Sequence, residues 1–241
     1  MRVDILGITV DPYSMQETVE RIRRAVEGRV RMRVITANPE IIYASERDDK
    51  LKKIIATADI ITADGIGVVW AAQWLGAREL ERVTGIDLVQ ALFPIAHEGK
   101  WRIFFLGGKP GVAEQAANQV VMKNQGITCA TMHGYFSPEE EIKVLEKIRH
   151  FQPDLLLVGL GAPFQEYWIA EHPGLATVSI GVGGSFDVLA GITARAPRSI
   201  QDCHLEWLYR LWKEPWRWKR QVVLPRFVIK VLWQRFKNKT L

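Results

Sequence analysis

Short apolar runs alternate along the chain with longer segments in which apolar residues recur at the three- and four-residue spacing of a helix. Strands that alternate with helices pair through right-handed crossovers, so we expect an α/β fold with a mostly parallel sheet. The runs are apolar at consecutive positions, which is typical of strands covered by helices on both faces. The predicted strands are Val3–Ile8, Val34–Thr36, Ile60–Thr62, Ile103–Leu106, Ile127–Met132, Leu155–Val158 and Val178–Ile180.

Helix starts are marked by residues that cap free backbone N–H groups. Ser14 is followed three residues later by Glu17, which predicts a capping box, and Ser137 opens a second one. Asn38 is a good N-cap, with Pro39 at the first helical position. These signals place helices directly after several of the predicted strands.

Nearly every predicted strand ends in a cluster of Gly, Asn, Asp or Gln just before a helix. In an open α/β sheet, ligands bind beyond the carboxyl ends of the strands, where helix N-termini suit phosphate groups. Five such loops are expected to meet at one edge, and they lie around Asn38, Asp64, Gly107, Gly161 and Gly183.

Taken singly, these loops have structural explanations, since Asn38 is a cap and Asp64-Gly65 is a common turn dipeptide. No complete G-x-G-x-x-G occurs, and Lys109 is not followed by the Ser or Thr of a P-loop. The chain also lacks a D-x-D element, and its five histidines show no ligand spacing. The sequence therefore indicates no metal site.

The charge of the chain is concentrated at its C-terminal end. The whole chain carries a formal net charge of +5, yet residues 204–241 alone hold ten basic side chains and two acidic ones. The same segment holds five of the nine tryptophans. Tryptophan and arginine together favour the headgroup region of a bilayer. We therefore divide the chain into an α/β domain, residues 1–200, which carries the polar strand ends, and a membrane-associating appendage, residues 201–241.

Within the appendage, a helical wheel of Gln221–Lys237 brings Arg226, Lys230 and Lys237 to one side and leaves the rest broadly apolar, with Pro225 as a partial break. Two other interpretations remain open at this point. The segment would also fit a terminal helical hairpin packed on the body, with a solvated basic face. Nucleic acid is a further anionic partner, although the apolar arc exceeds what base stacking requires.

The N-terminal segment is typical of a strand and not of a signal peptide, and no run of about 18 apolar residues predicts a membrane-spanning helix. The two cysteines, Cys129 and Cys203, form no close motif. We expect a protein of the cytoplasm that binds peripherally to the inner face of the cell membrane.

Read together, the loops form an ordered series over nearly the whole chain. The series is T-A-N-P-E (36–40), A-D-G-I-G (63–67), R-V-T-G-I-D (82–87), F-L-G-G-K-P-G (105–111), H-G-Y-F (133–136), G-L-G-A-P-F-Q-E (159–166), G-V-G-G-S-F-D (181–187), R-A-P (195–197) and L-E-W-L-Y-R-L (205–211). This ordered set resembles the WecG/TagA/CpsF family of glycosyltransferases.

The resemblance implies a Rossmann-like core, a C-terminal appendage that meets the membrane, and an inverting transfer that needs no metal or other cofactor. Members of the family move N-acetylmannosamine, or its uronic acid, from UDP to undecaprenyl-diphosphate-linked N-acetylglucosamine. They serve the synthesis of teichoic acid, enterobacterial common antigen or capsule. The implied partners are therefore a UDP-sugar, a polyprenyl-diphosphate-linked acceptor and an anionic membrane, and not nucleic acid.

The resemblance also assigns roles to residues of this chain. The catalytic base of the family falls on Asp64. Polar pocket residues fall on Thr36, Asn38, Arg82 and Gln165, and appendage arginines that would hold the acceptor diphosphate fall on Arg210, Arg217 and Arg220. From their positions at strand ends, we assign donor binding to Gly107, Gly108, Tyr135, Gly183 and Asp187.

Two other classes of function are weighed against the transferase. The Gly-rich strand ends alone would fit a non-catalytic module that binds a nucleotide or dinucleotide. The basic tail alone would fit a nucleic-acid-binding protein. The sequence leaves open the donor sugar, the polysaccharide pathway and whether the chain forms a homo-oligomer.

Overall fold

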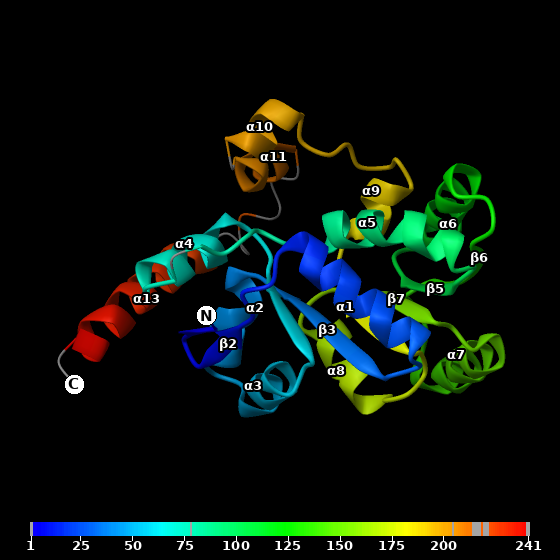
Figure 1. Ribbon diagram of the computed structural model, residues 1–241, viewed down its shortest axis with the longest axis horizontal. Coiled ribbons are helices and arrows are strands. Elements are labelled where there is room, and N and C mark those ends of the chain that lie inside the picture. The colour runs from blue at the N-terminus through cyan, green and yellow to red at the C-terminus, as the bar shows by residue number, and fades with distance from the viewer. Residues whose placement is uncertain (1, 78, 204, 214–217, 219–221, 240–241) are drawn as a thin grey trace.

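The computed structural model describes residues 2–77, 79–203, 205–213, 218 and 222–239, and its centre is a six-stranded parallel sheet (Figure 1). The strands lie in the order β4-β3-β8-β7-β5-β6, and every neighbouring pair in the sheet is parallel. Their bounds are β3 Met32–Ala37, β4 Ile60–Ala63, β5 Arg102–Gly107, β6 Thr128–Met132, β7 Leu155–Gly159 and β8 Val178–Gly181. The predicted α/β class with a mostly parallel sheet is confirmed.

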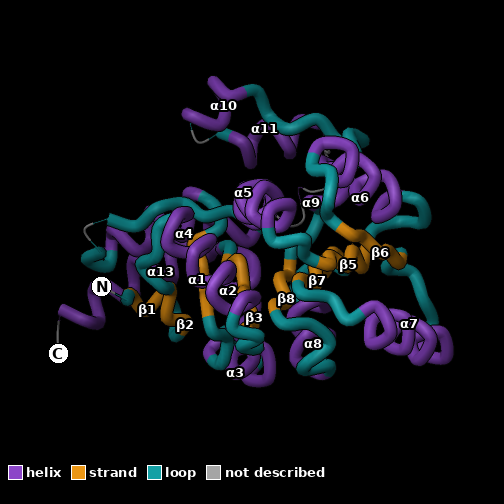
Figure 2. Tube along the Cα trace, turned by 45° about the vertical axis from the view of Figure 1, so that its right-hand side comes forward, coloured by secondary structure: helices purple, strands orange, loops and turns teal. Residues whose placement is uncertain are grey.

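Helices cover both faces of this sheet, as predicted (Figures 1 and 2). One face packs against α1 (Met15–Glu27), α5 (Gly85–Glu98), α6 (Val112–Lys123) and α9 (Ser185–Leu189). The other packs against α2 (Pro39–Ser45), α3 (Asp49–Ala56), α7 (Pro138–Phe151) and α8 (Phe164–Glu171). Consecutive strand residues point to opposite faces, so Phe104 and Phe105 are both fully buried but belong to different core clusters. This double burial explains the uninterrupted apolar runs in the sequence.

The first predicted strand, Val3–Ile8, is wrong, because this segment folds back on itself. It forms an antiparallel hairpin of β1 (Val3–Ile5) and β2 (Ile8–Val10), separate from the main sheet. Leu6 and Gly7 form the two-residue turn with φ angles of 53° and 85°. Positive φ at both positions matches the twist of the flanking strands, and glycine adopts it without strain.

The predicted helix caps are all present. The side chains of Ser14 and Ser137 each accept from the backbone three residues ahead, and the glutamates at those positions complete both capping boxes. Asn38 accepts from the N–H of Ile41 at 3.0 Å, with Pro39 in the first turn of α2. These starts depend on residues close in sequence, which is why the sequence alone locates them.

The C-terminal part contains α10 (Arg198–Asp202), α11 (Glu206–Lys213) and α13 (Val223–Lys239), which holds Pro225 in its first turn. The helix α13 lies along α4 (Ile66–Trp74) and α2 (Figure 1). It buries Phe227 and Val231 in the core cluster that β1, β2, α2 and α4 share. Packing of this helix on the body, one of the sequence-based alternatives, therefore occurs.

Polar contacts fix α13 in this position. Gln234 donates to the carbonyl oxygen of Asp4 at 3.0 Å and accepts from the N–H of Leu6 at 2.9 Å. Arg235 donates to the carbonyl oxygen of Trp74 at 2.6 Å and lies over its ring. Among the residues that the structure describes, no helix has the length and apolar character needed to cross a bilayer.

Candidate active site

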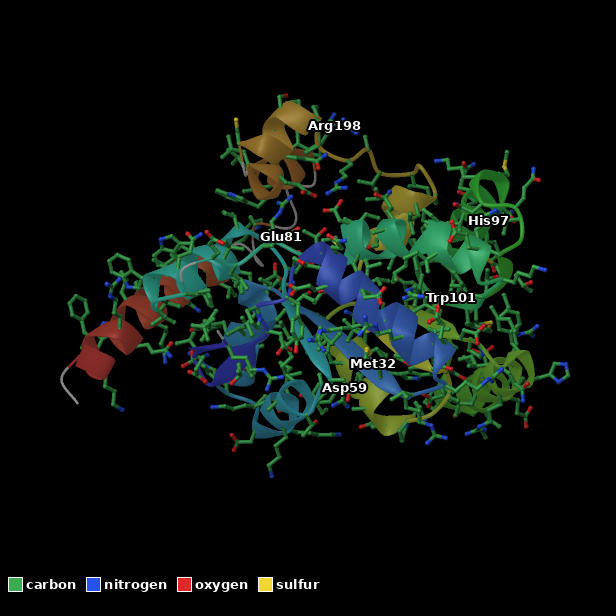
Figure 3. The ribbon with its side chains drawn as sticks, viewed as in Figure 1. Met32, Asp59, Glu81, His97, Trp101 and Arg198 are labelled. Atoms are coloured by element: carbon green, nitrogen blue, oxygen red, sulfur yellow. The ribbon has the colours of Figure 1, made fainter. Side chains whose placement is uncertain are left out.

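The candidate site lies where β3 and β8 end side by side. After β3 the chain enters α2 on one face of the sheet, and after β8 it enters α9 on the opposite face. Such a point of divergence, at the carboxyl ends of two neighbouring strands, is the usual ligand position in such sheets. In Figure 3, Met32 and Asp59 mark the amino ends of β3 and β4, whereas Glu81 lies toward the opposite edge, close to the site.

Asp64 follows β4 directly and is half-buried at this edge. Its N–H donates to the carbonyl oxygen of Ala37 at 2.8 Å, which ties it to the end of β3. Its Oδ2 accepts a hydrogen bond from the N–H of Gly85 at 3.3 Å. Gly85 is the first residue of α5, so the Asp64 side chain lies at the positive end of that helix dipole. The predicted base is thus positioned by two backbone segments.

The segment before α5 is held against β4. Val83 donates its N–H to Ala63 at 2.9 Å, and its carbonyl oxygen accepts from the hydroxyl of Thr62 at 3.1 Å. Thr84 caps α5 by accepting from the N–H of Asp87 at 3.2 Å. These contacts bring Arg82 and the first turn of α5 to the edge that carries Asp64.

Thr36 is the second-to-last residue of β3, and its side chain bridges two strands. Its hydroxyl donates to the carbonyl oxygen of Gly181, at the end of β8, at 3.2 Å. A Cβ atom on Gly85 would lie 3.4 Å from the Thr36 hydroxyl oxygen, so α5 starts against this side chain. Thr36 and Asp64 therefore both lie against Gly85, in one group as predicted.

Gln165 is buried in the first turn of α8, and its carboxamide spans two loops. Its Oε1 accepts from the N–H of Gly183 at 3.0 Å, and its Nε2 donates to Glu166 at 2.8 Å. A Cβ atom on Gly181 would lie 2.7 Å from Gln165 Nε2, so a larger residue there would displace the carboxamide. Gly181 is thus held by Thr36 at its carbonyl group and packed against Gln165 at its Cα atom.

A cluster of charged residues flanks this group. Arg195 donates two hydrogen bonds to Asp87, at 2.5 and 2.8 Å. Glu206, at the start of α11, places Oε2 3.7 Å from Arg82 and 4.0 Å from Arg195. Of the four residues in this charged cluster, the resemblance assigned a role only to Arg82. Asp87 and Arg195 were not assigned one, although they lie in the R-V-T-G-I-D and R-A-P motifs.

The pKa values in this cluster reflect its ion pairs. Burial acts to raise the pKa of Asp87, but the hydrogen bonds from Arg195 and Thr84 and the charges of Arg195 and Arg82 outweigh it and lower the pKa. The pKa of Arg195 is raised, chiefly by its hydrogen bond to Asp87. Burial acts to lower this pKa, whereas the negative charges of Asp87, Glu206 and Asp64 raise it further. The cluster therefore keeps a permanent cation near Asp64.

The predicted donor residues lie along the same edge but mostly farther from Asp64. Three strands separate β4 from β5, which at a strand spacing of about 4.8 Å puts Gly107 about 19 Å from Asp64. Gly108 donates its N–H to Gly159 at 3.1 Å, and Tyr135 is 67% exposed. Gly183 alone joins the group around Gln165 directly, whereas Asp187 lies half-buried in α9.

Arg217 and Arg220 lie outside the described residues, and of Arg210 the structure places only the backbone, in α11. Within the described part of the chain, no three His, Cys, Asp or Glu side chains gather where they could hold a metal ion. Metal independence therefore stays a prediction.

Comparison with known proteins completes this description. The model of the glycosyl transferase WecG/TagA/CpsF family matches residues 3–241. This chain belongs to the WecG/TagA/CpsF family of glycosyltransferases. The family membership confirms the resemblance and the enzyme class, and it favours the transferase over the non-catalytic nucleotide-binding module.

Curated relatives in this family come from Staphylococcus aureus. The chain is 36% identical over 234 residues to an N-acetylglucosaminyldiphosphoundecaprenol N-acetyl-beta-D-mannosaminyltransferase of strain MW2, covering 95% of this chain and 92% of the relative. Proteins with the same name from strains NCTC 8325 / PS 47 and COL are 36% identical over 237 residues, with the same coverage. The similarity therefore includes the site and the C-terminal helices.

Proposed function

We propose that this glycosyltransferase moves N-acetylmannosamine from a UDP donor to N-acetylglucosaminyl-diphosphoundecaprenol, a step in the synthesis of a cell-surface polymer such as teichoic acid. The name of the relatives, which match 95% of the chain, supports both the sugar and the acceptor. The observation that carries the proposal is the position of Asp64, a carboxylate at a strand end that α5 holds through the N–H of Gly85.

In this mechanism Asp64 is the general base. Its carboxylate accepts the proton of the acceptor hydroxyl as that oxygen attacks the anomeric carbon from the side opposite UDP. The new glycosidic bond forms while the bond to the β-phosphate oxygen breaks, so the configuration at the anomeric carbon inverts. Contact with two backbone segments keeps the base in one position, which lowers the entropic cost of the attack.

The leaving UDP gains negative charge at its β-phosphate. In this proposal Arg82 and Arg195 supply the compensating positive charge, since both lie at the edge that holds Asp64. Thr36, Asn38 and Gln165 line the reaction centre as polar contacts. The loops at Gly107 and Tyr135, farther along the edge, are assigned to the nucleotide part of the donor.

Membrane docking through the C-terminal helices belongs to the same proposal. Trp212 on α11 and Trp233 and Phe236 on α13 are 72%, 73% and 68% exposed, and Arg226 and Lys237 on α13 are exposed as well. Exposed tryptophans beside cations suit the headgroup region of an anionic bilayer. The enzyme would then bind at the inner face of the cell membrane, where Arg210, Arg217 and Arg220 would reach the acceptor diphosphate.

A UDP-release assay tests this function. Purified full-length protein is incubated with a lipid-diphosphate N-acetylglucosamine analogue and a panel of UDP-sugars, in the presence of EDTA. We expect UDP release that depends on the acceptor and is selective for UDP-N-acetylmannosamine. Release with a different sugar would correct the donor. Activity that returns only with added divalent metal would contradict the metal-independent mechanism.

A further inference from the structure

A second carboxyl group, that of Glu166, lies beneath the site and takes no part in the mechanism above. Its side chain is in the first turn of α8 and is only 3% exposed. Its Oε1 accepts from Gln165 Nε2 at 2.8 Å, and a Cβ atom on Gly181 would lie 3.1 Å from the same oxygen. Its Oε2 is buried and has no hydrogen-bond partner among the described residues.

An ionised carboxylate in this position would be costly, because no cation among the described residues forms an ion pair with it. Burial raises the pKa of Glu166, and the hydrogen bonds from Gln165 and from its own backbone N–H oppose this only in part. Burial therefore disfavours the ionised form of the Glu166 carboxyl group.

The contact with Glu166 decides which way the carboxamide of Gln165 points. Because Glu166 Oε1 takes the N–H of Gln165, the amide oxygen of Gln165 is left for the N–H of Gly183 at 3.0 Å. Gly183 has a φ angle of 51°, which glycine adopts without strain, and its hydrogen bond to Gln165 ties the loop after β8 to the first turn of α8. A rotated amide would turn its N–H groups toward the N–H of Gly183 and lose that contact.

We propose that Glu166 is a positioning residue, whose buried carboxyl group fixes the carboxamide of Gln165 and, through it, the loop at Gly183. The inference rests on the proposed function in so far as this loop and Gln165 form part of the transfer site. Gly181 transmits the effect, since it packs against Gln165 and Glu166 and also accepts the hydrogen bond of Thr36.

Two substitutions distinguish the effect of the acceptor oxygen of Glu166 from the effect of its charge. Glu166→Gln keeps a carbonyl oxygen for Gln165, whereas Glu166→Met keeps the volume of the side chain and removes both oxygens. We expect kcat to fall about tenfold to a hundredfold in Glu166→Met, with KM nearly unchanged, since misplaced groups act on the reacting geometry. Glu166→Gln should stay within about threefold of the wild type.

Glu171→Gln is the matched control, because Glu171 lies at the end of the same helix but is exposed and paired with Lys50. It should leave turnover unchanged. A Glu166→Gln variant that folds but loses more than about tenfold in kcat would overturn the proposal, because a charge would then be required. If Glu166→Met does not fold, the kcat of Glu166→Gln still tests the proposal by this tenfold criterion.

A double-mutant cycle shows whether Glu166 acts through Gln165. Adding Glu166→Met to Gln165→Ala should cost nothing further in kcat if the two residues act as one unit. Losses that multiply would show that Glu166 works by another route and would overturn the proposal.

A readout without substrate keeps the inference separate from the proposed function. Hydrogen exchange measured by NMR should show the Gly183 amide exchanging about tenfold faster in Glu166→Met than in the wild type, with Glu171→Gln unchanged. Unchanged exchange at Gly183 would overturn the positioning role even if turnover falls. Faster exchange would support it even if no UDP-sugar in the panel is turned over, a result that would count against the proposed function alone.

Discussion

The hydroxyl of Thr36 donates to the carbonyl oxygen of Gly181 at 3.2 Å, and this contact joins the carboxyl ends of β3 and β8. The two residues are 145 positions apart in the sequence. Their pairing connects Asp64, which lies beside Gly85 and Thr36, with Gln165, which packs against Gly181. These five residues from separate motifs therefore form one site because two strands lie next to each other.

Thr36→Val tests this connection, since valine keeps the branched shape but removes the hydroxyl donor. We expect an unchanged fold and a fall in kcat of about tenfold, because the carbonyl oxygen of Gly181 loses its partner. Thr36→Ser keeps the hydroxyl and is the matched control, expected to remain within about threefold. Equal activity in the Val and Ser variants would show that the hydrogen bond is dispensable. Turnover under saturating donor is the measurement.

The Arg195–Asp87 pair predicts a loss of stability in acid. The pKa of Asp87 is lowered from its usual 3.8, so its contribution to stability is present above pH 3.8 and is lost as the pH falls through the lower, folded-state pKa. Urea unfolding of the wild type and of Asp87→Asn should therefore give free energies that converge as the pH falls from about 5 to about 2. A constant difference over this range would contradict the ion-pair account.

Glu166 predicts the opposite trend. Its pKa is raised from 4.5, so the stability that the protonated group contributes is complete below pH 4.5 and is lost as the pH rises through the folded-state pKa. The amide in Glu166→Gln does not titrate. This variant should therefore gain stability relative to the wild type as the pH rises above 4.5, in the same urea experiment. Parallel curves for the two proteins would show that the pKa of Glu166 is not raised in the folded state.

The exposed aromatic side chains of the C-terminal helices predict membrane affinity. Replacing Trp212 and Trp233 with serine should weaken binding to anionic vesicles by about tenfold or more for each side chain, because each loses apolar contact with the bilayer. Met122 on α6 is 73% exposed, as Trp233 is, so Met122→Ser is the control and should bind normally. Vesicle sedimentation measures the effect. Unchanged binding of the double variant, or tighter retention of the wild type on nucleic acid, would contradict membrane docking.

The sequence predicted well those features of the fold that depend on neighbouring residues, such as the starts of helices. Ser14, Asn38 and Ser137 cap helices because their partners lie three residues ahead, and no distant contact competes with them. The polar strand ends met at one edge because parallel strands share a direction. The hairpin at Leu6 and Gly7 was missed because a leucine with positive φ leaves no local pattern that marks a turn.

The candidate site was predicted only where a family motif named the residue. Asp64, Thr36 and Gln165 lie in one group as expected, but the donor residues Gly107 and Tyr135 lie along the other half of the edge. The roles of Asp87 and Arg195 depend on a contact across 108 residues, and burial of Glu166 depends on the packing of α8 against β8. Neither distance nor burial can be obtained from spacing along the chain.

The most direct test compares acceptor-dependent UDP release in the wild type, Asp64→Asn and Asp49→Asn. Asp49 is exposed in the first turn of α3, away from the strand ends, so its variant controls for the loss of one carboxylate. The account predicts that Asp64→Asn binds the UDP-sugar and keeps its fold but turns over about 10²- to 10⁴-fold more slowly, whereas Asp49→Asn is unchanged. Turnover of Asp64→Asn within about tenfold of the wild type would contradict the role of Asp64 as the catalytic base.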